Sequence, residues 1–412
     1  MISFNTYKLP NGLTLIHNED KNTTLCVCNI LYNVGARDEN PEQTGFAHLF
    51  EHLMFGGSVN IPSFDTPLQM ASGENNAFTS NDITNYYITL PAENIETALW
   101  LESDRMLRLD FNEKALKVQK GVVIEEFKQR YLNQPYGDAW LKLRPLAYEK
   151  HPYQWATIGK EISHIENAKL QDVEAFFDKF YNPSNAIISL AGYIDFEAAK
   201  TLVIKWFGDI PAGPVNSNKY TLETPKFIRK ELTIEADVPQ RAIFMAFDTV
   251  ARNHTDYYAL DVLTDMLSGT ESSRFTEVLV KQKGVFSHVS AYISGDIDPG
   301  LLVVEGKLNE NIEFDEAEQS VLEIFFQIMK EGLQSNELEK VKNKAITGNL
   351  FSKTSVLNKA MGLCYSHLLG DTNKINTEID EIQKITEADV LRVCKTYLST
   401  KNYTVLKYQP KK

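Results

Sequence analysis

The stretch HLFEHLMFGG, at residues 48–57, holds two of the eight histidines of the chain, four positions apart, with a glutamate between them. Apolar residues recur at helical spacing, and no Gly or Pro occurs between positions 46 and 55, which predicts a helix. At about 100° per residue, His48, Glu51 and His52 lie on one face of that helix. The rest of the helix is apolar, so placing three ionisable groups on it is costly unless something compensates.

A divalent cation would compensate for these three groups. Two imidazoles at positions i and i+4 can bind one zinc ion, and Glu51 can then reach a water molecule at the metal. The order H-x-x-E-H is the inverzincin signature. The alternative is a helix with two core histidines, His48 and His52, held by hydrogen bonds. The motif alone leaves both interpretations open.

A catalytic zinc ion usually takes three protein ligands and a water molecule, so a third ligand is expected elsewhere. The segment GVVIEEFKQR, on a second predicted helix, offers Glu125 and Glu126. Adjacent residues on a helix diverge by about 100°, so only one of them can face the metal. We take Val122, Val123 and Phe127 to mark the buried side, which favours Glu126 as the ligand and leaves Glu125 in solvent.

The sequence contains an internal duplication. Similar segments recur at offsets of 215, 217 and 217 residues, and they pair Arg37 with Arg252, Asp172 with Asp389 and Asn185 with Asn402. A nearly constant offset over separate segments indicates duplication, because chance similarity would not keep this register.

Strand-like and helical patterns cluster within each half and do not alternate one by one, which favours an α+β fold. We therefore predict two tandem homologous α+β domains, each an antiparallel sheet with helices packed on one face. The expected boundaries are 1–212 for the N-terminal metal-binding domain, 213–225 for a linker rich in Pro, Gly, Ser and Asn, and 226–412 for the C-terminal repeat.

Composition excludes several classes of protein. The chain has 412 residues and a net charge of -13, so we expect no nucleic-acid binding. No apolar run approaches the ~18 residues of a membrane span, so we expect no membrane insertion. The beginning of the sequence has no signal-peptide pattern, and we expect a cytoplasmic protein, although a trimmed signal peptide would leave no trace.

The motifs and their flanks resemble the pitrilysin and mitochondrial processing peptidase family of zinc peptidases, in its short two-domain bacterial type. The resemblance covers nearly the whole chain. The matching segments are YKLPNGLTLI, GARDENPEQTGFAHLFEHLMFGGS, GENNAFTSNDITNYYITLP, ALWLESDRM, GVVIEEFKQR and FYNPSNAIISLAG, and Glu126 follows His52 by 74 residues.

The resemblance implies a zinc-dependent endopeptidase that hydrolyses peptides or unfolded polypeptide segments. His48, His52 and Glu126 would hold one zinc ion per chain, and Glu51 would act as general base and acid. The substrate would bind as an added strand along Asn76, Ala77 and Phe78. The alternative for those three residues is a plain edge strand.

The resemblance also implies that the second half lacks the metal motif. The segment LDVLTDMLSGT stands in its place, with Asp261, Thr264 and Asp265 near the positions of His48 and its neighbours. A single zinc site per chain follows.

This sequence departs from the family pattern at two places. Gln119 replaces a Glu that is often found seven residues before the ligand Glu. Short bacterial members supply an Arg and a Tyr from the second domain to bind substrate; here Arg274 fits the Arg, but Ser287 occupies the Tyr position. His288 and Tyr292 are nearby but out of register. The alternative for Arg274 is a surface or structural arginine.

These departures lead to an expectation about partners. Some family members are heterodimers in which one subunit has the zinc motif and its partner completes the substrate site. We expect a dimer, with a heterodimer that includes a paralogous subunit lacking the zinc motif favoured over a homodimer. The competing function is a non-catalytic assembly or binding subunit of the same fold.

Overall fold

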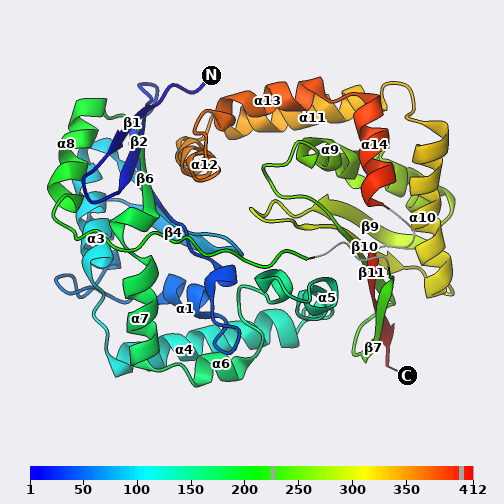
Figure 1. The fold of residues 1–412 in the computed structure, drawn as a ribbon, viewed down its shortest axis with the longest axis horizontal. Coiled ribbons are helices and arrows are strands. Elements are labelled where there is room, and N and C mark those ends of the chain that lie inside the picture. Colours follow the sequence, from blue (N-terminus) through cyan, green and yellow to red (C-terminus); the bar gives the residue numbers. More distant parts are fainter. Residues whose placement is uncertain (224–227, 399–402, 412) are drawn as a thin grey trace. The chain divides into compact units, whose positions relative to one another are not determined.

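The computed structural model describes residues 1–223, 228–398 and 403–411, which form two compact units. The first unit contains Met1–Phe127, Trp155–Tyr220 and Leu350–Thr377. The second unit contains Lys128–Gln154, Thr221–Asn349 and Glu378–Lys412. Each unit has one β-sheet with packed helices (Figure 1), so the predicted fold class, two α+β domains, is confirmed.

The sheet of the first unit has the strand order β1-β2-β6-β3-β5-β4. Its strands are β1 (Asn5–Lys8), β2 (Thr14–Glu19), β3 (Leu25–Tyr32), β4 (Glu74–Thr79), β5 (Thr84–Pro91) and β6 (Ala186–Gly192). All neighbours pair antiparallel except β2 and β6, which are parallel. The sheet therefore differs in one pair from the antiparallel sheet expected.

The first unit has helices on both faces of its sheet. They are α1 (Phe46–Leu53), α2 (Asp65–Met70), α3 (Ile95–Leu107), α4 (Glu113–Phe127), α6 (Ile162–Glu166), α7 (Leu170–Phe180), α8 (Phe196–Phe207), α12 (Val356–Leu368) and the short helices η1 (Ala36–Asp38), η2 (Ala92–Asn94) and η5 (Pro183–Asn185). Helix α3 contacts β3 and β5, whereas α12 packs on β3 and β6, where Leu363 and Cys364 meet Leu31 and Ile187. The expectation of helices on one face is corrected: the apolar run of β3 is buried on both faces.

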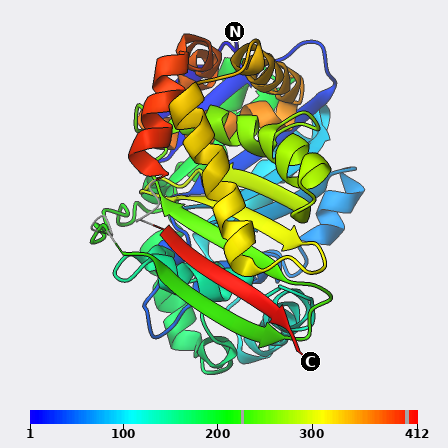
Figure 2. The same cartoon turned by 90° about the vertical axis from the view of Figure 1, so that its right-hand side faces the viewer.

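The sheet of the second unit has the order β7-β11-β8-β10-β9. Its strands are β7 (Lys230–Ala236), β8 (Ala242–Asp248), β9 (Phe286–Ile293), β10 (Leu301–Leu308) and β11 (Tyr403–Pro410). Its helices are α5 (Ala139–Ala147), α9 (Tyr257–Ser268), α10 (Phe314–Glu331), α14 (Glu387–Tyr397), η3 (Lys128–Leu132), η4 (Pro152–Gln154) and η6 (Phe275–Gln282). Figure 2 shows β11 running beside β7, its parallel neighbour, with α10 in front of the sheet. One face packs on α9, α10 and α14, and the other on α5.

The two sheets confirm the duplication predicted from the sequence. In each, a parallel pair (β2 with β6, β7 with β11) is followed by three antiparallel pairings in the same order. β6 begins at Ala186 and β11 at Tyr403, which keeps the offset of 217. Asp172 and Asp389 both occupy the third position of a helix and accept a backbone hydrogen bond there. Asn402 lies outside the described residues.

The compact units differ from the continuous domains 1–212 and 226–412 expected from the sequence. Residues 128–154 belong to the second unit because α5 packs on β8 and β11. Residues 350–377 belong to the first unit because α12 packs on its sheet. The remaining helices, α11 (Glu337–Ser352) and α13 (Lys374–Lys384), have residues in both units. Within the described residues, no helix has the length and apolarity that crossing a bilayer requires.

Candidate metal centre

Helix α1 is held in place by its apolar face. It begins after Gly45, whose φ of 90° is left-handed and where a Cβ would lie 2.7 Å from the carbonyl oxygen of Ile158. Phe46, Leu49, Phe50 and Leu53 are buried, and Phe50 stacks on Phe176 of α7 with ring centroids 5.1 Å apart. This packing fixes the rotation of α1, so its remaining face presents His48, Glu51 and His52.

Helix α4 brings Glu126 to this face of α1. Val123 and Phe127 are buried, whereas Glu125 is exposed, as the sequence predicted. One step of that prediction is wrong: Val122 does not mark the buried side, because it is 45% exposed. Glu126, not Glu125, is the residue of this pair whose carboxylate lies beside the histidines of α1.

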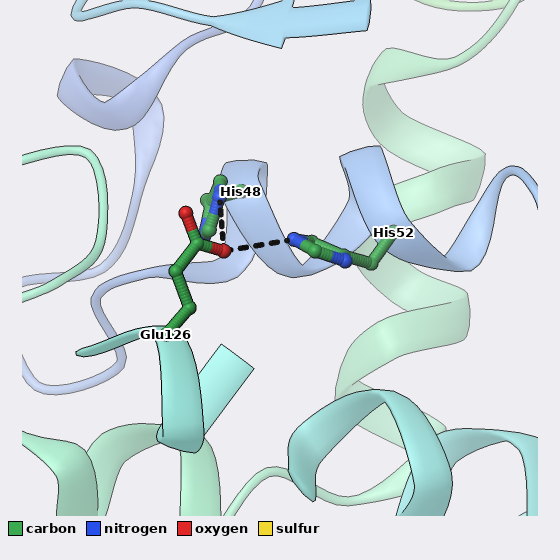
Figure 3. Close-up of side chains that lie close together, drawn as sticks. All are labelled: His48, His52 and Glu126. Atoms are coloured by element: carbon green, nitrogen blue, oxygen red, sulfur yellow. Dashed lines mark ion pairs between the residues drawn. The ribbon is translucent and has the colours of Figure 1, made fainter. Parts of the chain in front are cut away.

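The two imidazoles converge on one carboxylate oxygen. Glu126 Oε2 lies 3.5 Å from His48 Nε2 and 3.3 Å from His52 Nε2 (Figure 3). A nitrogen–oxygen hydrogen bond involving a charged group is about 2.7–2.9 Å long, so both contacts are long for direct hydrogen bonds. Ligand atoms about 2.0–2.1 Å from a tetrahedral zinc ion are ~3.3 Å apart, which matches both distances. The donor set, two imidazoles and a carboxylate, is also one that zinc prefers.

The described residues contain one group of three side chains that could hold a metal ion. Within residues 1–223, 228–398 and 403–411, only His48, His52 and Glu126 bring three potential ligand atoms from His, Cys, Asp or Glu within 4.8 Å of one another. The corresponding helix of the second unit, α9, carries Asp261 and Asp265. There the Nζ of Lys344 lies 3.0 Å from Asp265 Oδ1, so a lysine supplies the positive charge.

Glu51 is oriented by an adjacent strand. The hydroxyl of Thr79, the last residue of β4, donates a hydrogen bond of 2.7 Å to Glu51 Oε2. Burial raises the pKa of the Glu51 carboxyl above its ordinary value, and the Thr79 hydrogen bond opposes that rise. Glu51 is thus a fixed, partly desolvated carboxylate beside the group of potential ligands.

The strand that carries Thr79 is an edge strand. Within the described residues, β4 pairs with β5 on one side only. Asn76, Ala77 and Phe78 lie on it as predicted, and Phe78 is 39% exposed. The structure thus places these residues on a sheet edge that leads to Glu51.

Two residues that support the site were not found from the sequence. Thr79 is one; the other is Glu39, whose buried carboxylate accepts hydrogen bonds from the backbone N–H groups of Gly45 and Ala47 at 2.8 and 2.9 Å. The indole of Trp155 donates a third at 3.1 Å. Burial raises the pKa of Glu39 to about 8, although the three donors favour its ionised form. The missing side-chain cap at Gly45 is the sequence signal that another acceptor must serve the start of α1.

The contacts of Arg274 are those of a structural arginine, which was the alternative to a role in substrate binding. Its Nε and Nη2 each lie 2.8 Å from an oxygen of Glu337, and its side chain is only 9% exposed. Nη2 also donates to the carbonyl of Gly332. The guanidinium of Arg274 is buried and committed to this ion pair, which favours the structural alternative over the predicted role in substrate binding. Ser287 donates to the carbonyl of Lys307 and accepts from Gln240.

Comparisons with known proteins agree with this geometry. Residues 14–145 match the family described as insulinase (peptidase family M16), and residues 167–345 match the peptidase M16 inactive domain. Zinc protease PqqE of Helicobacter pylori is 27% identical over 416 residues, which cover 98% of this chain and 92% of the relative. The mitochondrial-processing peptidase subunit beta of Saccharomyces cerevisiae is 28% identical over 261 residues, 61% of this chain and 55% of the relative.

The fold comparison points the same way. The crystal structure of a protease from Helicobacter pylori matches with a TM-score of 0.93 at 25% identity, covering 100% of both chains. A chain with two related α+β units, and with two histidines and a glutamate gathered in the first, fits a metallopeptidase. The chain belongs to peptidase family M16, as the resemblance predicted.

Proposed function

We propose that this chain is a zinc-dependent endopeptidase of the inverzincin type. The observation that carries the proposal is the convergence of His48, His52 and Glu126, at distances that fit one tetrahedral zinc ion. A zinc ion held there would act as a Lewis acid on the scissile carbonyl and on the attacking water. Family membership and the name of the zinc protease relative support the same activity.

The residues of the chain divide the remaining work. Glu51 accepts the proton of the attacking water and passes it to the leaving amine. Thr79 holds the Glu51 carboxylate in place through its 2.7 Å hydrogen bond. The substrate, a peptide or an unfolded segment, pairs its backbone with the free edge of β4 along Asn76, Ala77 and Phe78. Main-chain pairing makes this recognition tolerant of sequence.

The alternative is a non-catalytic subunit of the same fold. The match to the inactive domain, residues 167–345, lies outside the segments that carry the four proposed metal and catalytic residues. It therefore agrees with a second half that has no metal site, and it does not weigh against catalysis by the first.

We further propose that the chain works as a dimer, preferably with a paralogous subunit that lacks the zinc motif. Support comes from the relative whose name describes it as a subunit of a peptidase, and from Ser287 and the buried Arg274, which leave the second unit without the expected substrate-binding pair. Size-exclusion chromatography, and peptide cleavage before and after addition of a paralogous subunit, test this. Full activity of the chain as a homodimer would remove the heterodimer proposal.

The function itself is tested by digestion of a peptide library. Wild type and Glu51→Gln are compared, with and without a zinc chelator, after the zinc content of both has been measured. We expect internal cleavage by wild type, loss of cleavage with the chelator, and a decrease of at least about 100-fold in Glu51→Gln with zinc retained. A zinc-free chain whose behaviour is insensitive to Glu51→Gln would support the non-catalytic alternative.

A further inference from the structure

A pocket of about 390 Å³ opens beside the free edge strand of the first unit. It is lined by Leu25 and Val27 of β3, Glu74, Asn75 and Asn76 of β4, Tyr87 and Thr89 of β5, and Ser355, Val356 and Leu357 at the start of α12. The pocket therefore has a floor formed by one face of the sheet and a wall formed by the first turn of a helix.

Successive side chains of β4 point to opposite faces of the sheet, and this alternation shows on which face the pocket lies. Glu74 and Asn76 point to the pocket face, and Thr79, an odd number of residues from Glu74, points to the opposite face, where it contacts Glu51. At ~3.3 Å per residue, Glu74 lies ~17 Å along the strand from Thr79. A substrate peptide paired with β4 would therefore run past Glu51 and then past the pocket.

The pocket combines patches of apolar surface with one charged side chain. Glu74 is the only acidic or basic residue among those that line it, and its side chain is exposed. Within the described part of the chain, the Glu74 carboxylate takes part in no ion pair or side-chain hydrogen bond. Leu25 and Leu357, which also line the pocket, offer apolar surface. A long side chain with an aliphatic stem and a cationic head matches this combination.

We propose that this pocket binds a lysine or arginine side chain of the substrate. The inference rests on the proposed peptidase function and adds a specificity determinant, Glu74, to it. In paired strands, side chains that lie opposite each other project to the same face. The basic residue thus lies opposite Asn76 or Glu74, which is three or five residues from the substrate residue that lies opposite Thr79.

A lysine scan of a synthetic peptide tests this. The parent peptide has one cleavable bond and otherwise uncharged residues, and each variant carries a single lysine at one position on either side of that bond. For wild type we expect kcat/KM to rise about three- to tenfold over the parent when lysine lies three or five residues, on one side, from the residue that lies opposite Thr79. In Glu74→Gln the ratio of kcat/KM for the lysine peptide to kcat/KM for the parent peptide should fall to about one. In Glu74→Lys the enzyme should prefer a glutamate at that position of the peptide.

The matched control is Glu93→Gln, which changes an exposed glutamate of the same unit that does not line the pocket. This variant should keep the wild-type ratio of kcat/KM for the lysine peptide to kcat/KM for the parent peptide. If wild type cleaves the peptides without positional preference for lysine, or if Glu74→Gln keeps that preference, the pocket assignment is overturned and the peptidase function stands.

Dissociation constants of the same peptides for Glu51→Gln, with and without Glu74→Gln, give an independent measurement. Lysine-dependent binding that needs Glu74, without cleavage by wild type, would keep the pocket and overturn the peptidase.

Discussion

The carboxylate of Glu39 accepts a hydrogen bond from the backbone N–H of Ala47, the residue directly before His48. The same carboxylate accepts from Gly45, where α1 has no side-chain cap of its own. A glutamate six residues upstream of Gly45 thus satisfies the first N–H groups of the helix that carries the proposed metal ligands. The position of His48 therefore depends on Glu39.

We expect Glu39→Gln to lower the free energy of unfolding by about 1–3 kcal/mol, because an amide has only one acceptor oxygen for the two N–H groups. Urea unfolding measures this change, and titration with zinc shows whether affinity for the metal falls with it. Glu42→Gln is the control, since Glu42 is exposed on the same segment. Equal stability of the two variants would contradict a capping role for Glu39.

Glu126→Gln should reduce zinc affinity by at least about 100-fold, because it replaces a charged ligand with a neutral amide. Zinc content measured by mass spectrometry should fall from one per chain to well below one. The adjacent Glu125→Gln removes the same charge from an exposed position and should leave zinc content unchanged. Loss of zinc in both variants would indicate a general effect of charge.

Thr79→Val removes the hydroxyl that donates to Glu51 while keeping the shape of the side chain. We expect kcat to fall about tenfold, the scale of one hydrogen bond to a charged group, with zinc content preserved. Thr79→Ser keeps the donor and should restore most of the activity. A Thr79→Val enzyme with wild-type kcat would show that Glu51 needs no such support.

Arg274→Met should destabilise the protein by about 3–5 kcal/mol, because it leaves Glu337 buried without its partner. The double variant Arg274→Met/Glu337→Leu should regain much of this stability. Thermal unfolding and peptide kinetics are measured together. A raised KM with unchanged stability would instead restore Arg274 as a substrate-binding residue.

The ion pair between Asp20 and Lys359 predicts a pH dependence. Lys359 Nζ lies 2.5 Å from Asp20 Oδ2, and this hydrogen bond, with one from the backbone of Asn22, holds the pKa of Asp20 below its ordinary value. The stabilisation is therefore fully present above about pH 4, the ordinary pKa of Asp, and is lost as the pH falls through the folded-state pKa.

Lys359→Met tests this dependence. We expect it to cost about 1–2 kcal/mol at pH 7, and the difference in melting temperature from wild type should shrink toward pH 3. Lys114→Met, at an exposed position on α4, is the control. A difference that stays constant with pH would exclude the ionised Asp20 as the partner of Lys359.

The parts of the site that follow from local periodicity could be predicted from the sequence. His48, Glu51 and His52 are close in sequence, and helical geometry alone puts them on one face. The duplication was visible because its offset is nearly constant, and the strand orders of the two sheets agree with it. Both features need no knowledge of tertiary packing.

Features that depend on long-range packing could not be predicted. Thr79 reaches Glu51 across 28 positions, and nothing in its local sequence distinguishes it from other strand threonines. Val122 is exposed although it is apolar, so the buried side of α4 could not be read from hydrophobicity alone. The buried pairing of Arg274 with Glu337 spans 63 positions and has no local signature.

The packing of α12 on the first sheet also determines when one face of that sheet can be covered during synthesis. Leu363 and Cys364 cover Leu31 and Ile187, which leave the ribosome much earlier. Until translation has passed this helix, the face of the nascent sheet stays apolar and uncovered, and the pocket beside β4 lacks its wall. The pocket beside β4 therefore cannot form before α12, which spans Val356–Leu368, has been synthesised and has packed on the sheet.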